Sequence, residues 1–194
     1  MGKRHDAKEL RRWEDGCRAW AHERARDMVI ALHTGDDIPL QPYGVGLVLH
    51  TGEVAWCQTL IRSSLDPTPA TSALTSSWQL ALRPWIVTSE RVFGRLSNDR
   101  LAGFRWAKIV GCRVDLTAGA EYVALDVEHQ PFPALWRGPG CAPLAVAAVY
   151  QLYGSHALLD HPGLDAIRRR QPTSRRARTQ LLLRELGPSS GRLR

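Results

Sequence analysis

The sequence predicts an α+β protein, built on a small antiparallel β-barrel or sandwich that is closed by a C-terminal helix. Short runs between Val54 and Trp136 alternate apolar and polar residues, as half-buried strands do. A helical apolar pattern follows this region at Pro143–Tyr153, and another precedes it, ending near His33. A chain of 194 residues is long enough for one such domain with extensions at both ends.

The first expected element is an amphipathic helix over about residues 6–33, within a predicted N-terminal unit of residues 1–34. Asp6 is expected to cap its start, with Glu9 in the reciprocal position, and Gly35 follows its end. Such a helix either packs on the body of the domain or pairs with a second copy, so the sequence leaves a homodimer open. The stripe that repeats at heptad-like spacing consists of Leu10, Trp13, Cys17, Trp20, Arg24, Met28, Ala31 and Leu32.

Short strands and polar turns are expected across the centre of the chain. The stretch from Trp85 to Leu116 is the part around which the rest is organised. A Ser/Thr/Pro-rich loop at residues 63–77 interrupts the series. The inward face of the long strand at its end is predicted to be Val110, Cys112, Val114 and Leu116. The expected strands are residues 54–62, 78–82, 85–88, 91–96, 101–106, 109–116, 122–127 and 132–136.

The closing helix is expected to begin at Pro143, because a missing N–H costs nothing in the first turn, and to end at Gly154. Its apolar stripe is Val146, Val149, Tyr150 and Tyr153. Residues 155–194 then form a basic C-terminal extension. A short helix is expected over residues 163–170, and residues 172–187 are either helical or disordered.

Several short motifs resemble those of bacterial pleckstrin-homology-like (PH-like) and GRAM-like domains. They are Gly52-Glu53-Val54 before a strand, the run Trp85–Val92 containing Thr88-x-x-Arg91, and Phe104–Ile109 before the long strand. The resemblance covers residues 44–154 and implies a PH-like barrel capped by a helix. The chain also resembles a type of actinobacterial protein that supplies no activity to carry over.

The resemblance implies a binding role, and the residues limit which one. Such domains often hold lipid phosphates with basic residues near the first hairpin loop, but Ser63–Ser77 contains no Lys or Arg and includes Asp66. A peptide or protein laid along a strand edge, or against the closing helix, fits better. Arg91 is expected either to pair with an acid such as Glu53 or Glu90, or to contact a ligand. The predicted cations of the barrel surface are Arg91, Arg95, Arg105 and Lys108.

No sequence motif for catalysis is present, so a non-enzymatic protein without cofactor or metal is expected. The chain has no Walker loop, no GxGxxG after a strand, no HExxH and no GxSxG. His156 and His161, with Asp160 and Asp165, are better explained as surface and capping residues than as metal ligands. Nothing brings Glu53 and Asp115 together as paired carboxylates. The four Cys are scattered and are expected to be buried or incidental thiols.

Residues 168–194 contain nine basic residues and one acidic residue, an excess that by itself exceeds the net charge of +7 of the whole chain. Such density attracts polyanions, so nucleic acid and anionic membrane are both candidate partners of this extension. Arginine abundance also follows from the genome, since the chain has 23 Arg and three Lys, and a solvated extension is the plainer interpretation. The predicted polyanion-binding residues are Arg168, Arg169, Arg170, Arg175, Arg176 and Arg178.

The sequence therefore favours a bacterial adaptor that recognises a protein partner through its barrel. A nucleic-acid-associated accessory protein that uses the extension is the first alternative, and an adaptor at an anionic membrane surface is the second. No secretory signal and no apolar run of membrane-spanning length is recognised. A cytoplasmic location follows, either free or peripheral at a membrane or at the nucleoid.

Overall fold

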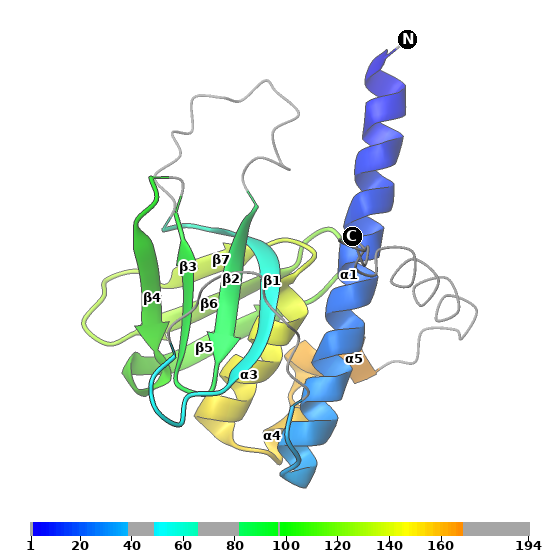
Figure 1. The fold of residues 1–194 in the computed structure, drawn as a ribbon. Helices are drawn as coiled ribbons and strands as arrows, with labels where there is room; N and C mark the ends of the chain where they lie inside the picture. Colours follow the sequence, from blue (N-terminus) through cyan, green and yellow to red (C-terminus); the bar gives the residue numbers. More distant parts are fainter. Residues whose placement is uncertain (1, 39–48, 66–81, 97, 169–194) are drawn as a thin grey trace, which may run out of the picture.

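The computed structural model describes residues 2–38, 49–65, 82–96 and 98–168 (Figure 1). The expected strand at 78–82 falls almost wholly outside these ranges. The elements in chain order are α1 (Gly2–Thr34), β1 (Ala55–Ser63), β2 (Arg83–Thr88), β3 (Arg91–Arg95), β4 (Leu101–Arg105), η1 (Trp106–Lys108), β5 (Ile109–Asp115), β6 (Tyr122–Val127), β7 (Ala134–Arg137), α3 (Cys141–Tyr153), α4 (Ala157–Asp160), η2 (Pro162–Leu164) and α5 (Asp165–Arg168).

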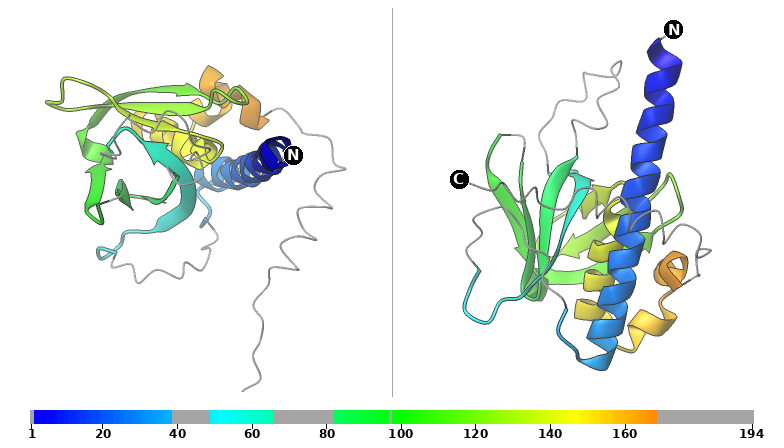
Figure 2. Two further views of the ribbon diagram at one scale, coloured as in Figure 1. Left: turned by 90° about the horizontal axis from the view of Figure 1, so that it is seen from above. Right: turned by 45° about the vertical axis from the view of Figure 1, so that its right-hand side comes forward.

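The strands form one seven-stranded antiparallel sheet, which confirms the α+β class. Their order is β4-β3-β2-β1-β7-β6-β5. Within the described ranges β4 and β5 do not pair with each other, so the sheet is curled but open, with these two strands as its edges. Figure 2 shows the sheet curving round one side of α3, which packs against β1, β2, β5 and β6.

Burial alternates along β3, β4, β7 and most of β1, as the sequence predicts, whereas Trp85–Thr88 of β2 are all buried. Trp85 and Trp136 meet edge-to-face with ring centroids 5.3 Å apart, and Phe104 packs on Trp136 at 6.1 Å. One predicted core position is wrong. Val110 is exposed because a bulge between Ile109 and Gly111 shifts the register of β5 against β6. The alternation of apolar and polar residues in the sequence does not reveal such a bulge.

Helix α3 is enclosed on all sides, which the predicted single stripe did not anticipate. Every residue from Cys141 to Val149 is buried. The sheet covers one side of the helix, and α1 covers another with Ala21, Ala25 and Met28. A helix that is apolar all round belongs in a core. Over Cys141–Val149 the helix therefore offers no surface to a partner. Of the two places where the sequence predicts partner binding, the closing helix and the strand edges, the edges are left.

The two halves of α1 have different surroundings. Its C-terminal half packs on α3 and α5, while its N-terminal half extends beyond the sheet (Figure 1). Met28 and Ala31 of the predicted stripe are buried, and Arg24 reaches the carbonyl oxygen of Trp56. This helix thus docks on its own chain. A dimer through α1 stays a prediction, and it would have to use the extended N-terminal half.

The segment after α3 folds back and covers part of the β5 edge. Gly163 of η2 lies so close to β5 that an added Cβ would come 2.8 Å from Cβ of Val114. Arg26 of α1 donates a hydrogen bond from Nε to the Ile167 carbonyl at 2.8 Å and ties α5 down. Helices α1, α3 and α5 consequently share one hydrophobic core with the sheet.

Candidate functional site

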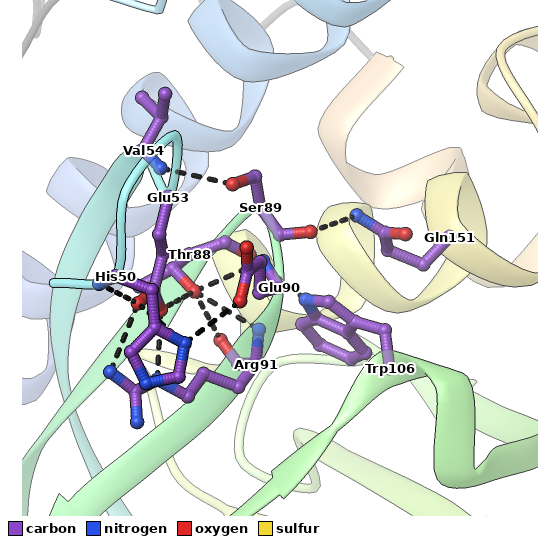
Figure 3. A network of polar contacts seen from close by, with 9 residues as sticks. All are labelled: His50, Glu53, Val54, Thr88, Ser89, Glu90, Arg91, Trp106 and Gln151. Carbon is purple, nitrogen blue, oxygen red and sulfur yellow. Dashed lines mark hydrogen bonds and ion pairs between the residues drawn. The ribbon is translucent and has the colours of Figure 1, made fainter.

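A buried ion pair fixes the start of the β3–β4 arm (Figure 3). Arg91 donates from Nε to Oε1 of Glu53 at 2.8 Å and from Nη2 to Oε2 at 2.9 Å. Thr88 Oγ1 donates to Glu53 Oε1 at 2.7 Å, and the backbone N–H of His50 donates to Oε2 at 2.9 Å. Burial acts to raise the pKa of Glu53, but these hydrogen bonds outweigh it and lower the pKa to about 2.

This network ties the turn between β2 and β3 to the core, and it confirms the expected pairing of Arg91 with Glu53. Trp106 Nε1 donates to the Thr88 carbonyl at 2.8 Å, and Gln151 of α3 donates to the Ser89 carbonyl at 3.0 Å (Figure 3). The Arg91 guanidinium also lies 4.6 Å from the centre of the Phe93 ring. Arg91 therefore acts within the fold and orients β3.

His50, Glu53 and Glu90 bring three potential ligand atoms within 4.8 Å of one another. A metal ion there would meet a carboxylate that already accepts four hydrogen bonds, two of them from a guanidinium. The cation would have to displace Arg91 from a buried acid, which costs several kcal/mol. This cluster supports the β2–β3 turn and is not assigned as a metal centre.

Three of the four predicted surface cations share one face. Arg91 lies directly opposite Arg105, and Arg95 lies opposite Leu101. The three arginines therefore project from the outer side of β3 and β4. Glu53 neutralises Arg91, and Arg95 lies 3.7 Å from the exposed Asp99. No ion pair to Arg105 occurs among the described residues. Lys108 stands apart on η1, paired with Glu128 at 2.7 Å.

The hydrogen-bond pattern shows which groups of β4 point away from the sheet. Leu96 N–H donates to the Arg100 carbonyl, and Trp106 N–H donates to the Glu90 carbonyl, each at 2.9 Å. These are hydrogen-bonded pairs, and in an antiparallel ladder such pairs alternate with non-bonded ones. Ala102 and Phe104 therefore bond to β3. The backbone N–H and C=O groups that face the free edge are those of Leu101, Gly103 and Arg105.

The outer face of β4 is apolar at one end, bare in the middle and cationic at the other end. Leu101 is 72% exposed, and Arg105 is exposed at the opposite end. Between them, a Cβ at Gly103 would come 2.5 Å from Cβ of Phe93 and from the Val92 carbonyl oxygen, so only glycine fits. The Phe93 side chain thus lies beside a stretch of edge backbone that no other described segment pairs with.

The β5 edge is built differently. It carries the bulge at Val110, its far end is covered at Val114 by Gly163, and its cations are paired. Arg113 lies 3.3 Å from Asp126, next to the Lys108–Glu128 pair. Bulges, covering segments and charged side chains are among the devices with which proteins block edge pairing.

Of the predicted polyanion-binding residues, only Arg168 falls within the described ranges. Its guanidinium is held by the carbonyls of Leu159 and His161 and by Asp165, so it closes the α4–α5 segment. The predicted role of the extension stays a prediction. The remaining cations, which lie outside the described residues, are Arg169, Arg170, Arg175, Arg176 and Arg178.

The other residues that the sequence considered are dispersed. His161 Nδ1 accepts the N–H of Gly163 and caps η2, and Asp165 pairs with Arg168. Asp115 accepts the Thr117 N–H at 2.8 Å, at the end of β5 and not beside Glu53. All four cysteines are free thiols, and burial raises the pKa of Cys57 to about 12.

Sequence reasoning missed a cavity of about 430 Å³ that lies between α1 and the ends of β1, β5, β6 and β7. The residues that line this cavity come from separate segments of the chain, so no local motif predicts it. Arg18 of α1 pairs there with the buried Glu121. The lining carries three guanidinium and three carboxylate groups, and this balance favours no charge class of ligand.

Comparison with known proteins adds one structural likeness. No family model matches the chain, and no curated protein matches it. Among solved structures, the chain is similar to the Vps36 N-terminal PH domain, with 9% identity and a TM-score of 0.39, over 58% of this chain and 86% of that one. Likeness at this level assigns no family, so function is argued from the chain itself. Within the described residues, no helix is long and apolar enough to span a membrane.

Proposed function

We propose that this chain is a non-enzymatic binding module, an adaptor of the bacterial cytoplasm that captures a protein partner along an open edge of a PH-like curled sheet. The observation that carries the proposal is the pair of sheet edges. Both β4 and β5 end the strand order, and each carries one large apolar side chain that is about 70% exposed. Unpaired edge groups supply affinity through main-chain hydrogen bonds, and neighbouring side chains supply specificity.

Two features direct this proposal to the edges. Helix α3 is buried from Cys141 to Val149 and offers no surface there. Of the predicted surface cations of the barrel, Arg91 pairs with Glu53 and Lys108 pairs with Glu128, while Arg105 lies on the edge strand β4 itself. A partner that adds a strand needs neither a pocket nor free charge.

The test places a photo-crosslinking amino acid at one of three positions of matched exposure and exposes each protein to an extract of the source cell. Leu101 on β4 and Val110 on β5 are 72% and 70% exposed, and Phe132, between β6 and β7, is 78% exposed and serves as the control. The proposal predicts crosslinks from position 101 or 110 and none from position 132.

The same crosslinks are expected in the chain of residues 1–168, which keeps Arg168 because that side chain holds the α4–α5 segment together. If crosslinking disappears in this shortened chain, or is equal at all three positions, edge capture is wrong. Retention on DNA or on anionic vesicles that vanishes with residues 169–194 would instead support the two alternatives based on the extension.

A further inference from the structure

We infer that the β4 edge is the one that binds, and that it takes an extended acidic segment of a partner protein with apolar residues at alternate positions. This inference rests on the proposed function, because it presupposes strand capture, and it adds the edge and the chemistry of the ligand. The residues that carry it are Leu101, Gly103 and Arg105, which we call the β4 edge site.

The register of β4 makes it ready to accept a strand. It pairs with β3 in an unbroken register over all five residues, so its outward N–H and C=O groups keep regular spacing. By contrast, the bulge at Val110 breaks the spacing on β5. An incoming strand hydrogen-bonds to alternate residues of the edge. On β4 those residues are Leu101, Gly103 and Arg105.

Side-chain positions then specify the ligand. Residues of an added strand that lie opposite these three residues project on the same outer face, at every second position. Opposite Gly103 no side chain opposes the ligand, so an apolar group there spreads over the bare backbone toward Phe93. Opposite Leu101, which is 72% exposed, a second apolar group covers the exposed isobutyl side chain.

The charge of the site selects acids. Arg105 has no ion-pair partner among the described residues, and it lies directly across from Arg91. Glu53 neutralises Arg91, and Arg95 lies near Asp99, so the charge that remains available on β4 itself is that of Arg105. A carboxylate opposite Arg105 would pair with it, and the guanidinium offers it a forked pair of donors.

The probe is the peptide Glu-Thr-Val-Thr-Leu-Thr-Glu, amidated at its C-terminus and carrying a fluorophore on its N-terminal nitrogen. Its acidic ends and apolar third and fifth residues satisfy the site in either chain direction. We expect measurable binding in the full chain by fluorescence anisotropy of the labelled peptide, and weaker binding as salt rises, because the carboxylate–arginine attraction is screened. A peptide with Lys at both ends should bind at least tenfold more weakly.

Two matched variants decide which edge is used. Arg105→Glu reverses the charge of an exposed residue on β4 and should weaken binding at least tenfold. Arg113→Glu makes the same change on β5 and should leave binding within twofold. Leu101→Pro removes one outward N–H without removing a bond to β3, and should weaken binding as well. Circular dichroism checks that each variant is folded. If Leu101→Pro does not fold, the comparison of Arg105→Glu with Arg113→Glu decides which edge binds the peptide.

Each outcome separates the two proposals. If the peptide binds and is sensitive to Arg113→Glu but not to Arg105→Glu, the β5 edge binds, so the inference is wrong and edge capture stands. If the peptide does not bind at millimolar concentration, or the Lys-ended peptide binds equally well, the acidic ligand is wrong. Edge capture is then judged by the crosslinks from positions 101 and 110.

Discussion

Both edges of this sheet expose unpaired backbone groups, but the residues around the two edges protect them to different extents. An edge strand exposes unpaired backbone groups, and proteins usually block them. At β5 the chain supplies a bulge, a covering turn at Gly163 and two ion pairs. At β4, in the part of the chain that the structure describes, the corresponding features are the shortness of the strand and the charge of Arg105. The two edges of one sheet can thus differ in how readily they accept a further strand.

The largest expected difference between the two sides concerns the ion pair at the start of β3. Arg91→Leu leaves the buried carboxylate of Glu53 without its main partner, and should lower the free energy of unfolding by about 3 kcal/mol. The matched change on the β5 side is Lys108→Leu. It breaks an exposed pair with Glu128 and should cost less than about 1 kcal/mol. Urea denaturation measures both, and equal losses would contradict the structural role given to Arg91.

A second contrast lies in the edge glycines. In Gly103→Ala the new methyl group meets the Val92 carbonyl oxygen and the Phe93 backbone, which cannot move aside, so a loss of about 1–3 kcal/mol is expected. In Gly111→Ala the nearest atom is the carboxylate end of Asp126, 3.0 Å away on a flexible side chain. That variant should cost less than Gly103→Ala in the same denaturation experiment. The reverse order would mean that β3 and β4 pack less closely than described.

Acid should loosen the cover of the β5 edge. Burial, and then Arg26, lower the pKa of His22 below its ordinary value of 6.5, with Arg18 adding to this and Glu121 and the Ala166 backbone of α5 opposing it. Because the unfolded chain binds this proton more readily, stability falls as the pH drops below about 6.5 and through the folded pKa. Melting temperatures from pH 7.5 to 5.5 should show the decline.

His22→Gln should flatten this decline, because the residue can no longer be protonated. His129→Gln, which changes an exposed residue, serves as the control and should keep the wild-type profile.

The stability of the β3–β4 arm changes in a lower pH range. Glu53 has its pKa lowered to about 2, so its contribution is complete above its ordinary value of about 4.5 and disappears only as the pH falls from there toward 2.

Much of the fold follows from sequence alternation, and the reasons for the failures are physical. Buried positions such as Val92, Val123 and Leu125 lie at the alternate positions that the sequence pattern indicates, so the strands could be predicted. Val110 could not be placed, because a bulge changes facing without changing composition. A single apolar stripe does not predict that α3 is enclosed on all sides. The feature of the sequence that does is its run of small apolar residues.

The site was predicted in parts. The turn chemistry of Thr88, whose hydroxyl accepts the N–H groups of Glu90 and Arg91, predicted an acidic partner for Arg91 but left Glu53 and Glu90 both open, and the structure shows Glu53. The special status of Arg105 could not be found, since it depends on strand order and on which of its neighbours are neutralised. The edge that β4 forms is a property of the whole sheet, and no local pattern encodes it.

Residue-resolved amide exchange by NMR, with and without the acidic peptide, tests the β4 edge site most directly. In the free protein the N–H groups of Leu101, Gly103 and Arg105 should exchange quickly, while those of Ala102 and Phe104, bonded to β3, exchange slowly. Saturating peptide should slow the first set and leave β5 unchanged. Slow exchange at all five residues before the peptide is added, or protection that appears on β5 instead, would contradict the account.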